Sequence, residues 1–125
     1  MASILLVDDE PLVVESLTLA MESKGHSVVT AGNGAEGLKR FGERAFDVVI
    51  TDIIMPDTEG IETIREMKRR KPDAKIIAMS GGGRTGAGEF LKMARNLGAT
   101  ATLTKPIRLS DLFRTLNECL DDGGR

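Results

Sequence analysis

Residues 48–51 read Val-Val-Ile-Thr and are followed at once by Asp52. A continuous apolar, β-branched run of this kind is typical of a strand that is buried on both faces of a parallel sheet. Similar short runs occupy residues 3–7, 28–31 and 76–79, and a fifth strand is expected around Leu103. Amphipathic stretches with helical spacing follow each run. Strict alternation of five strands with five helices predicts an α/β fold.

The connections favour one sheet topology. Right-handed crossovers and a chain of 125 residues indicate a flavodoxin-like (βα)5 doubly wound parallel sheet with strand order 2-1-3-4-5. We expect a single domain over residues 1–125 with a flexible tail over 121–125. In the second helix, Asn33 is the predicted N-cap, and Ala35, Leu38 and Phe41 are predicted to face inward.

Composition excludes several classes of function. Seventeen Lys and Arg residues against 19 Asp and Glu residues give a net charge of −2, which argues against a general nucleic-acid binder. Aromatic residues make up only 3%, too few for base-stacking platforms. The single cysteine, Cys119, and the single histidine, His26, exclude an internal disulfide and leave little for zinc, so both are expected to be structural. No apolar run reaches membrane-spanning length, so we expect a cytoplasmic domain without membrane insertion.

Polar residues end four of the five predicted strands. Asp8 and Asp9 end the first, Asp52 the third, Ser80 the fourth and Lys105 the fifth. Ligands of open α/β sheets bind beyond the carboxyl ends of the strands, at the switch in strand order. Three carboxylates would therefore converge there, and a hard divalent cation such as Mg²⁺ would relieve their repulsion. A metal ion, the Lys105 ammonium group and the Ser80 hydroxyl together suit the oxygens of a phosphoryl group.

These residues lie in motifs whose order and spacing resemble the receiver domain of bacterial two-component response regulators. The resemblance runs from Ile4 to Leu120 and rests on Leu6-Val7-Asp8-Asp9, Asp52 with Met55-Pro56-Asp57 and Gly60, Met79-Ser80, Gly98-Ala99, and Leu103-Thr104-Lys105-Pro106. It implies a phosphorylated switch with no conventional enzymatic turnover. A histidine kinase or phosphotransfer protein would be the phosphoryl donor.

The resemblance also implies a role for each residue of the site. Asp52 would be the phosphoacceptor. Asp9, Asp52 and the backbone carbonyl of Ile54 would ligate Mg²⁺, or Mn²⁺ in its place, and Asp8 would hold a metal-bound water. Lys105 would pair with the phosphoryl oxygens, and the family leads us to expect a cis peptide bond between Lys105 and Pro106.

The switch is expected to depart from the family pattern. The Ser80 hydroxyl would move to the phosphoryl group, but Thr102 stands where the family usually has an aromatic residue that moves with it. We therefore expect the signal to pass mainly through the segment after Ser80, which begins Gly81-Gly82-Gly83. Neither Ile54 nor Gly82 can position an attacking water through a side chain, so slow dephosphorylation is expected. The first helix would meet the kinase, and the last two helices with the final strand would meet a downstream protein.

A second reading is a small dinucleotide-binding domain. Gly32, Gly34 and Gly37 follow a predicted strand and open a helix, and Asp52 follows about 20 residues on, as the fingerprint requires. This alternative leaves Asp8 and Lys105 without a role. Within the receiver reading, a stand-alone protein and a receiver that belongs to a longer regulator or hybrid kinase both remain open.

Overall fold

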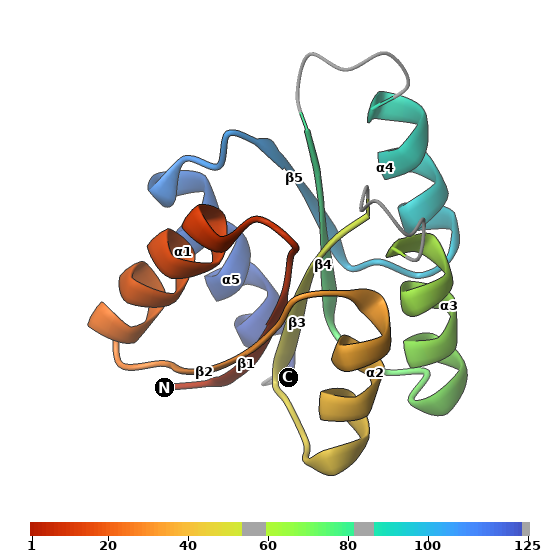
Figure 1. The fold of residues 1–125 in the computed structure, drawn as a ribbon, viewed down its shortest axis with the longest axis horizontal. Coiled ribbons are helices and arrows are strands. Elements are labelled where there is room, and N and C mark those ends of the chain that lie inside the picture. Colours follow the sequence, from red (N-terminus) through yellow and green to blue (C-terminus); the bar gives the residue numbers. More distant parts are fainter. Residues whose placement is uncertain (54–59, 82–86, 124–125) are drawn as a thin grey trace.

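The computed structural model describes residues 1–53, 60–81 and 87–123. Its five strands form one parallel sheet in the order β2-β1-β3-β4-β5, which confirms the predicted topology (Figure 1). The strands are β1 (Ser3–Val7), β2 (Ser27–Ala31), β3 (Val48–Asp52), β4 (Ile76–Gly81) and β5 (Ala101–Lys105). The helices are α1 (Pro11–Ser23), α2 (Gly34–Glu43), α3 (Gly60–Arg70), α4 (Ala87–Asn96) and α5 (Leu109–Gly123).

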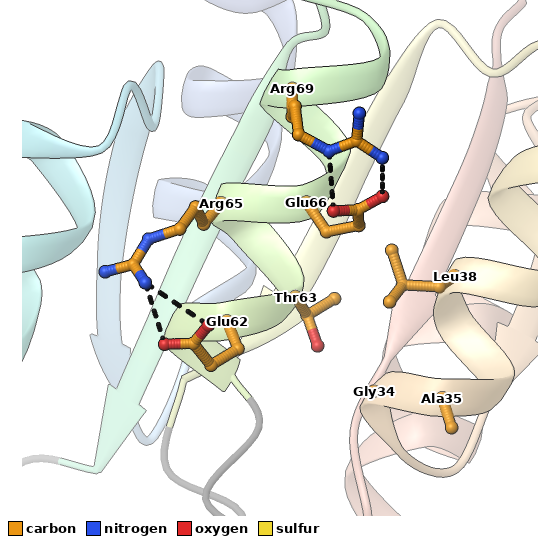
Figure 2. Close-up of a pocket in the computed structure, with 8 residues that line it drawn as sticks. All are labelled: Gly34, Ala35, Leu38, Glu62, Thr63, Arg65, Glu66 and Arg69. Atoms are coloured by element: carbon orange, nitrogen blue, oxygen red, sulfur yellow. Dashed lines mark hydrogen bonds and ion pairs between the residues drawn. The ribbon is translucent and has the colours of Figure 1, made fainter.

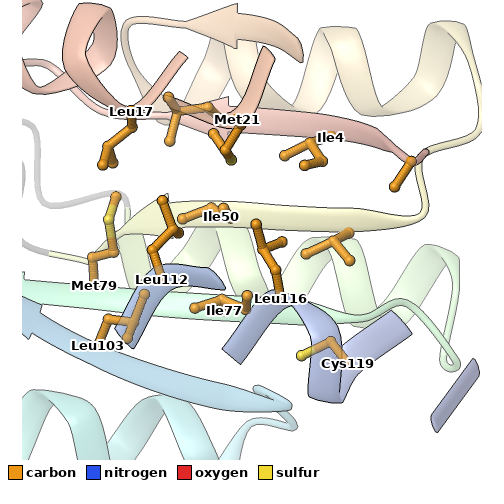
Figure 3. Close-up of a cluster of buried hydrophobic side chains, with 13 residues drawn as sticks. Ile4, Leu17, Met21, Ile50, Ile77, Met79, Leu103, Leu112, Leu116 and Cys119 are labelled. Atoms are coloured by element: carbon orange, nitrogen blue, oxygen red, sulfur yellow. The ribbon is translucent and has the colours of Figure 1, made fainter. Parts of the chain in front are cut away.

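Helices cover both faces of the sheet. α1 and α5 lie on one face, and α2, α3 and α4 lie on the other (Figure 1). Successive side chains of a strand point to opposite faces, so Ile4 and Leu6 of β1 join one buried cluster while Leu5 and Val7 join the other. Figure 3 shows the first cluster, in which Leu112 and Leu116 of α5 pack against the sheet. All five residues of β3 are buried, as expected for a central strand of a two-sided sheet.

The start of α2 is partly as predicted. The Asn33 side chain accepts a hydrogen bond from the Glu36 amide at 2.8 Å, which confirms it as the N-cap. The prediction that Ala35 faces inward is wrong, because Ala35 is exposed and Gly34 and Gly37 are the buried residues instead. A Cβ at Gly37 would lie 2.9 Å from Val7 Cγ2, so the missing side chain lets α2 approach β1 closely.

Several smaller predictions can be compared with the structure. Cys119 is buried in the core, and His26 accepts a hydrogen bond at Nδ1 from the Ala2 amide at 3.1 Å, so both have structural surroundings. The Lys105–Pro106 peptide bond is cis, as expected. α5 continues to Gly123, so the helix takes up the first three residues of the predicted tail. Among the described residues, no helix combines the length and the apolar character needed to span a bilayer.

Candidate functional site

Two of the predicted acidic residues come together where β1 and β3 end. Val7 pairs with Thr51 in the parallel register, so the residues that follow them, Asp8 and Asp52, lie at adjacent places on the sheet edge. Both are buried, with 1% and 3% of their surface exposed. Carboxylates are seldom this buried without a partner of opposite charge. The site therefore requires a cation.

Lys105, the last residue of β5, supplies that cation. Its Nζ lies 2.7 Å from Asp8 Oδ2, 2.8 Å from Glu10 Oε1 and 2.9 Å from Asp52 Oδ2. The lysine side chain is itself only 12% exposed. The structure thus brings Lys105 together with two of the three predicted carboxylates and with a fourth acidic residue.

Burial and pairing shift the pKa values in this cluster. Burial raises the pKa of Asp8 above its ordinary value, although hydrogen bonds from Lys105 and the Glu10 amide act in the opposite direction. For Lys105, burial by itself would lower the pKa, but the hydrogen bonds to Asp8, Glu10 and Asp52 together raise it. Lys105 therefore stays protonated at neutral pH and remains the counter-charge of the cluster.

Glu10 is a member of the site that the sequence reasoning missed. It is the N-cap residue of α1, and its backbone amide donates to Asp8 Oδ1 at 2.9 Å. Its own side chain makes no capping bond to the helix and extends to Lys105 instead. The sequence did contain one indication of this role, namely that Glu10 directly follows Asp8 and Asp9. The chain turns into α1 at this point, and such a turn can place the third acidic residue at the same edge of the sheet as the first two.

The donor set fits a hard divalent cation. Each of Asp8, Asp9, Glu10 and Asp52 offers one carboxylate oxygen, and these oxygens all lie within 4.8 Å of one another. Mg²⁺ and Mn²⁺ prefer such oxygen ligands. Asp9, which is exposed, is thus brought to the same place as the two buried carboxylates. Ile54, the other predicted ligand, lies outside the described residues.

Ser80 lies on the neighbouring strand with its side chain fully buried. It pairs with Thr104 in the register of β4 and β5, and the next pair is Gly81 with Lys105. The Ser80 hydroxyl has no hydrogen-bond partner among the described residues. Burying a hydroxyl without a partner costs free energy. The Ser80 hydroxyl is therefore available to donate a hydrogen bond to a ligand beside β5, the strand that carries Lys105.

The other predicted switch residues lie on β5 and at the end of β4 or beyond it. Thr102 is half-buried and pairs with Ala78 across the two strands. Gly81 is the last residue of β4, and Gly82 and Gly83 lie outside the described residues.

The glycines of the dinucleotide alternative have structural partners. The Gly32 amide donates to Glu36 Oε1 at 2.7 Å, and the Glu36 amide donates to Asn33. The two side chains thus satisfy backbone amides that a pyrophosphate would need at the helix N-terminus. Gly34 and Gly37 are buried at the packing surface of α2. This arrangement does not support the alternative.

A pocket of about 320 Å³ lies between α2 and α3 (Figure 2). Its charged residues pair with one another along α3: Arg65 with Glu62 at 3.1 Å and Arg69 with Glu66 at 2.6 Å. Hydrogen bonds from Arg69 and Arg70 lower the pKa of Glu66 to about 2. None of the residues predicted for the receiver site lines this pocket, although Gly34 of the dinucleotide alternative does. The side chains that could bind a metal ion or a phosphoryl group therefore lie at the sheet edge and not in this pocket.

The Lys105 ammonium group contacts a cluster of acidic side chains at the switch point of a five-stranded parallel sheet. This arrangement is typical of a receiver domain. The family model described as response regulator receiver domain matches residues 4–117, and the chain belongs to this family. A solved structure, a response regulator receiver domain protein from Clostridium thermocellum, superposes with a TM-score of 0.90 at 32% identity. The match covers 99% of this chain and 98% of that one.

Curated relatives fall into two size classes. Protein PilH of Pseudomonas aeruginosa is 34% identical, and the response regulator receiver protein CpdR of Brucella abortus is 33% identical. Each match covers 96% of this chain and 98% of the relative. The transcriptional regulatory protein GlrR of Escherichia coli is 32% identical over 96% of this chain, but the match spans only 26% of GlrR. The chain thus spans the length of some relatives and about a quarter of others.

Replacing Lys105 by Met is expected to destabilise the metal-free fold by about 2 kcal/mol, because Asp8 and Asp52 are then left buried without a counter-charge. Urea unfolding in EDTA measures the loss, and added Mg²⁺ should restore part of it. The loss should also shrink as the pH falls through the raised pKa of Asp8, because a protonated carboxyl needs no cation.

The matched control is Lys39→Met, which removes an exposed lysine that has no ion pair among the described residues. Equal losses for the two variants, or a loss at Lys105 that is independent of Mg²⁺ and pH, would contradict this account of the cluster.

Proposed function

We propose that the chain is a phosphorylated signalling switch whose phosphoacceptor is Asp52. The observation that carries the proposal is the buried Asp52 carboxylate, held 2.9 Å from the Lys105 ammonium group within a cluster of acidic residues. An aspartate in these surroundings can act as a nucleophile, and the adjacent cation can stabilise the charge of the group that it receives.

In the proposed reaction, an Asp52 oxygen attacks the phosphorus of a phosphohistidine on a histidine kinase or phosphotransfer protein. The new O–P bond forms as the N–P bond breaks, and the imidazole leaves with the electron pair and takes up a proton. Lys105 pairs with the phosphoryl oxygens, and the Ser80 hydroxyl donates to one of them. The product is an acyl phosphate, which is lost only by slow dephosphorylation, and no conventional enzymatic turnover follows.

The metal belongs to this proposal. Asp8, Asp9, Asp52 and the Ile54 carbonyl would hold Mg²⁺, for which Mn²⁺ could substitute. Bound Mg²⁺ would offset negative charge on the transferring phosphoryl group.

We further propose that α1, which begins beside the site, meets the phosphoryl donor, and that α4, β5 and α5 form the face for a downstream protein. On this view residues 1–125 work as a single receiver domain in the cytoplasm. Phosphorylation would shift a pre-existing equilibrium between two conformations and so change partner binding. Because Thr102 stands in place of an aromatic residue, the conformational change would pass mainly through Ser80 and the segment that follows it.

The test is labelling of the purified chain with a small phosphodonor such as acetyl phosphate. With Mg²⁺ we expect a mass increase of one phosphoryl group, which hydroxylamine removes because it cleaves acyl phosphates. In EDTA we expect little labelling. A phosphoryl group that resists hydroxylamine, or no labelling with Mg²⁺ at any donor concentration, would overturn the proposal.

A further inference from the structure

Glu10 makes the most exposed of the three contacts to Lys105. Its Oε1 lies 2.8 Å from Lys105 Nζ, and its side chain is 58% exposed. The side chains of the other two acids, Asp8 and Asp52, are 0% and 5% exposed. Three contacts of similar length therefore differ greatly in their access to solvent.

The contacts that Lys105 already makes determine how it can bind a phosphoryl group on Asp52. An ammonium group has three N–H donors, and two of them are used in hydrogen bonds to Glu10 at 2.8 Å and to Asp52 at 2.9 Å. Asp8 Oδ2 lies 2.7 Å from Nζ as an ion pair without hydrogen-bond geometry. A phosphoryl group on Asp52 would bring new acceptor oxygens into the same space. Three carboxylate oxygens already lie within 2.9 Å of Lys105 Nζ, so the phosphoryl oxygens would compete with them for its positive charge.

Glu10 is the contact that can be released at the lowest cost. If Asp8 left Lys105, a fully buried carboxylate would lose its counter-charge. Asp52 is the group that would carry the phosphoryl. The exposed Glu10 carboxylate, in contrast, can exchange Lys105 for water, and an exposed ion pair contributes little free energy.

We propose that Glu10 is a positioning residue that holds Lys105 in the unphosphorylated site and competes with the incoming phosphoryl group for it. This inference rests on the proposed function and adds a control on its rate. The negative charge of Glu10 at the exposed rim also opposes the approach of an anionic donor. Removing the charge should therefore speed acceptance of the phosphoryl group.

The first experiment compares Glu10→Gln with wild type in labelling by acetyl phosphate, at Mg²⁺ concentrations that saturate each variant. We expect roughly a two- to fivefold increase in the labelling rate, the factor that an exposed ion pair can supply. The control is Glu15→Gln, which removes an exposed acid of α1 that does not contact Lys105 and should leave the rate unchanged. An unchanged or lower rate for Glu10→Gln, or an equal increase for Glu15→Gln, would overturn the proposal.

The second experiment needs no phosphoryl transfer. In EDTA, Glu10→Gln should lower the melting temperature by about 2 °C in the wild-type background and by less in Lys105→Met, because the contact is already absent there. With Mg²⁺ and beryllofluoride, a phosphoryl mimic, the effect in the wild-type background should also fall. An equal shift in all three settings would show that Glu10 acts on the helix alone and would overturn the proposal. If wild type accepts no phosphoryl group, the proposed function fails, while the measurement in EDTA still tests the Glu10–Lys105 coupling.

Discussion

The variant Asp52→Asn is expected to lose acyl-phosphate formation, with labelling by acetyl phosphate reduced by about 100-fold or more. An amide cannot attack phosphorus as a carboxylate does. The Asn side chain has nearly the same shape and keeps an oxygen that can accept from Lys105, which contacts Asp52 at 2.9 Å. Circular dichroism and a melting curve should therefore show a folded protein. The loss is then one of chemistry rather than of structure.

The control for this prediction is Asp73→Asn, a change of the same type at an exposed residue of the loop between α3 and β4. It should label as wild type does. Hydroxylamine-sensitive labelling of Asp52→Asn at the wild-type rate would mean that another residue is the acceptor. It would contradict the central assignment while leaving the family membership intact.

The variant Gly60→Ala is expected to lose about 3 kcal/mol of unfolding free energy or more, and it is the largest stability effect that we predict. A Cβ at Gly60 would overlap the backbone of Ile53, including its Cα, carbonyl carbon and oxygen. Ile53 cannot move aside easily, because its amide donates to Met79 O at 3.0 Å and ties it to β4. Urea unfolding measures the change.

A second glycine provides the matched control. Gly42 lies in α2, and a Cβ there would find its nearest neighbour, a flexible Arg70 atom, at 3.8 Å. Gly42→Ala should therefore stabilise the fold by roughly 0.5–1 kcal/mol, the usual gain for this change within a helix. If Gly60→Ala is as stable as wild type, the close approach of α3 to the end of β3 is not as described.

The fold was predictable because its signals are local and repeated. Five short apolar runs, four of them ending at a polar residue, are sufficient to predict a two-sided parallel sheet and its order. The errors arise where a helix packs closely. Ala35 has the apolar character of an inward residue, but the buried positions belong to Gly34 and Gly37. At Gly37 the missing side chain lets α2 approach Val7. Composition cannot distinguish a glycine that packs from a glycine that bends the chain.

The site was predictable to the extent that strand ends define it. Asp8 and Asp52 follow or end neighbouring strands, so the sheet order brings them together. Lys105 ends β5, which β4 separates from β3, and its long side chain spans that distance. Glu10 was missed because it lies beyond the strand, and its contact with Lys105 depends on how the chain turns into α1. The orientation of a side chain after a turn is set by three-dimensional geometry that residue spacing does not encode.

The register of β1 and β3 also limits how such a chain can evolve. Each strand alternates its side chains between two faces, and the same alternation that buries Ile50 sets the direction of Asp52. An insertion or deletion of one residue in β3 before Ile50 would reverse both at once, turning Ile50 to the other face of the sheet and the Asp52 carboxylate away from Asp8. Changes in length are tolerated only in the connections between elements. The position of the Asp52 carboxylate beside Asp8 is therefore constrained by folding itself.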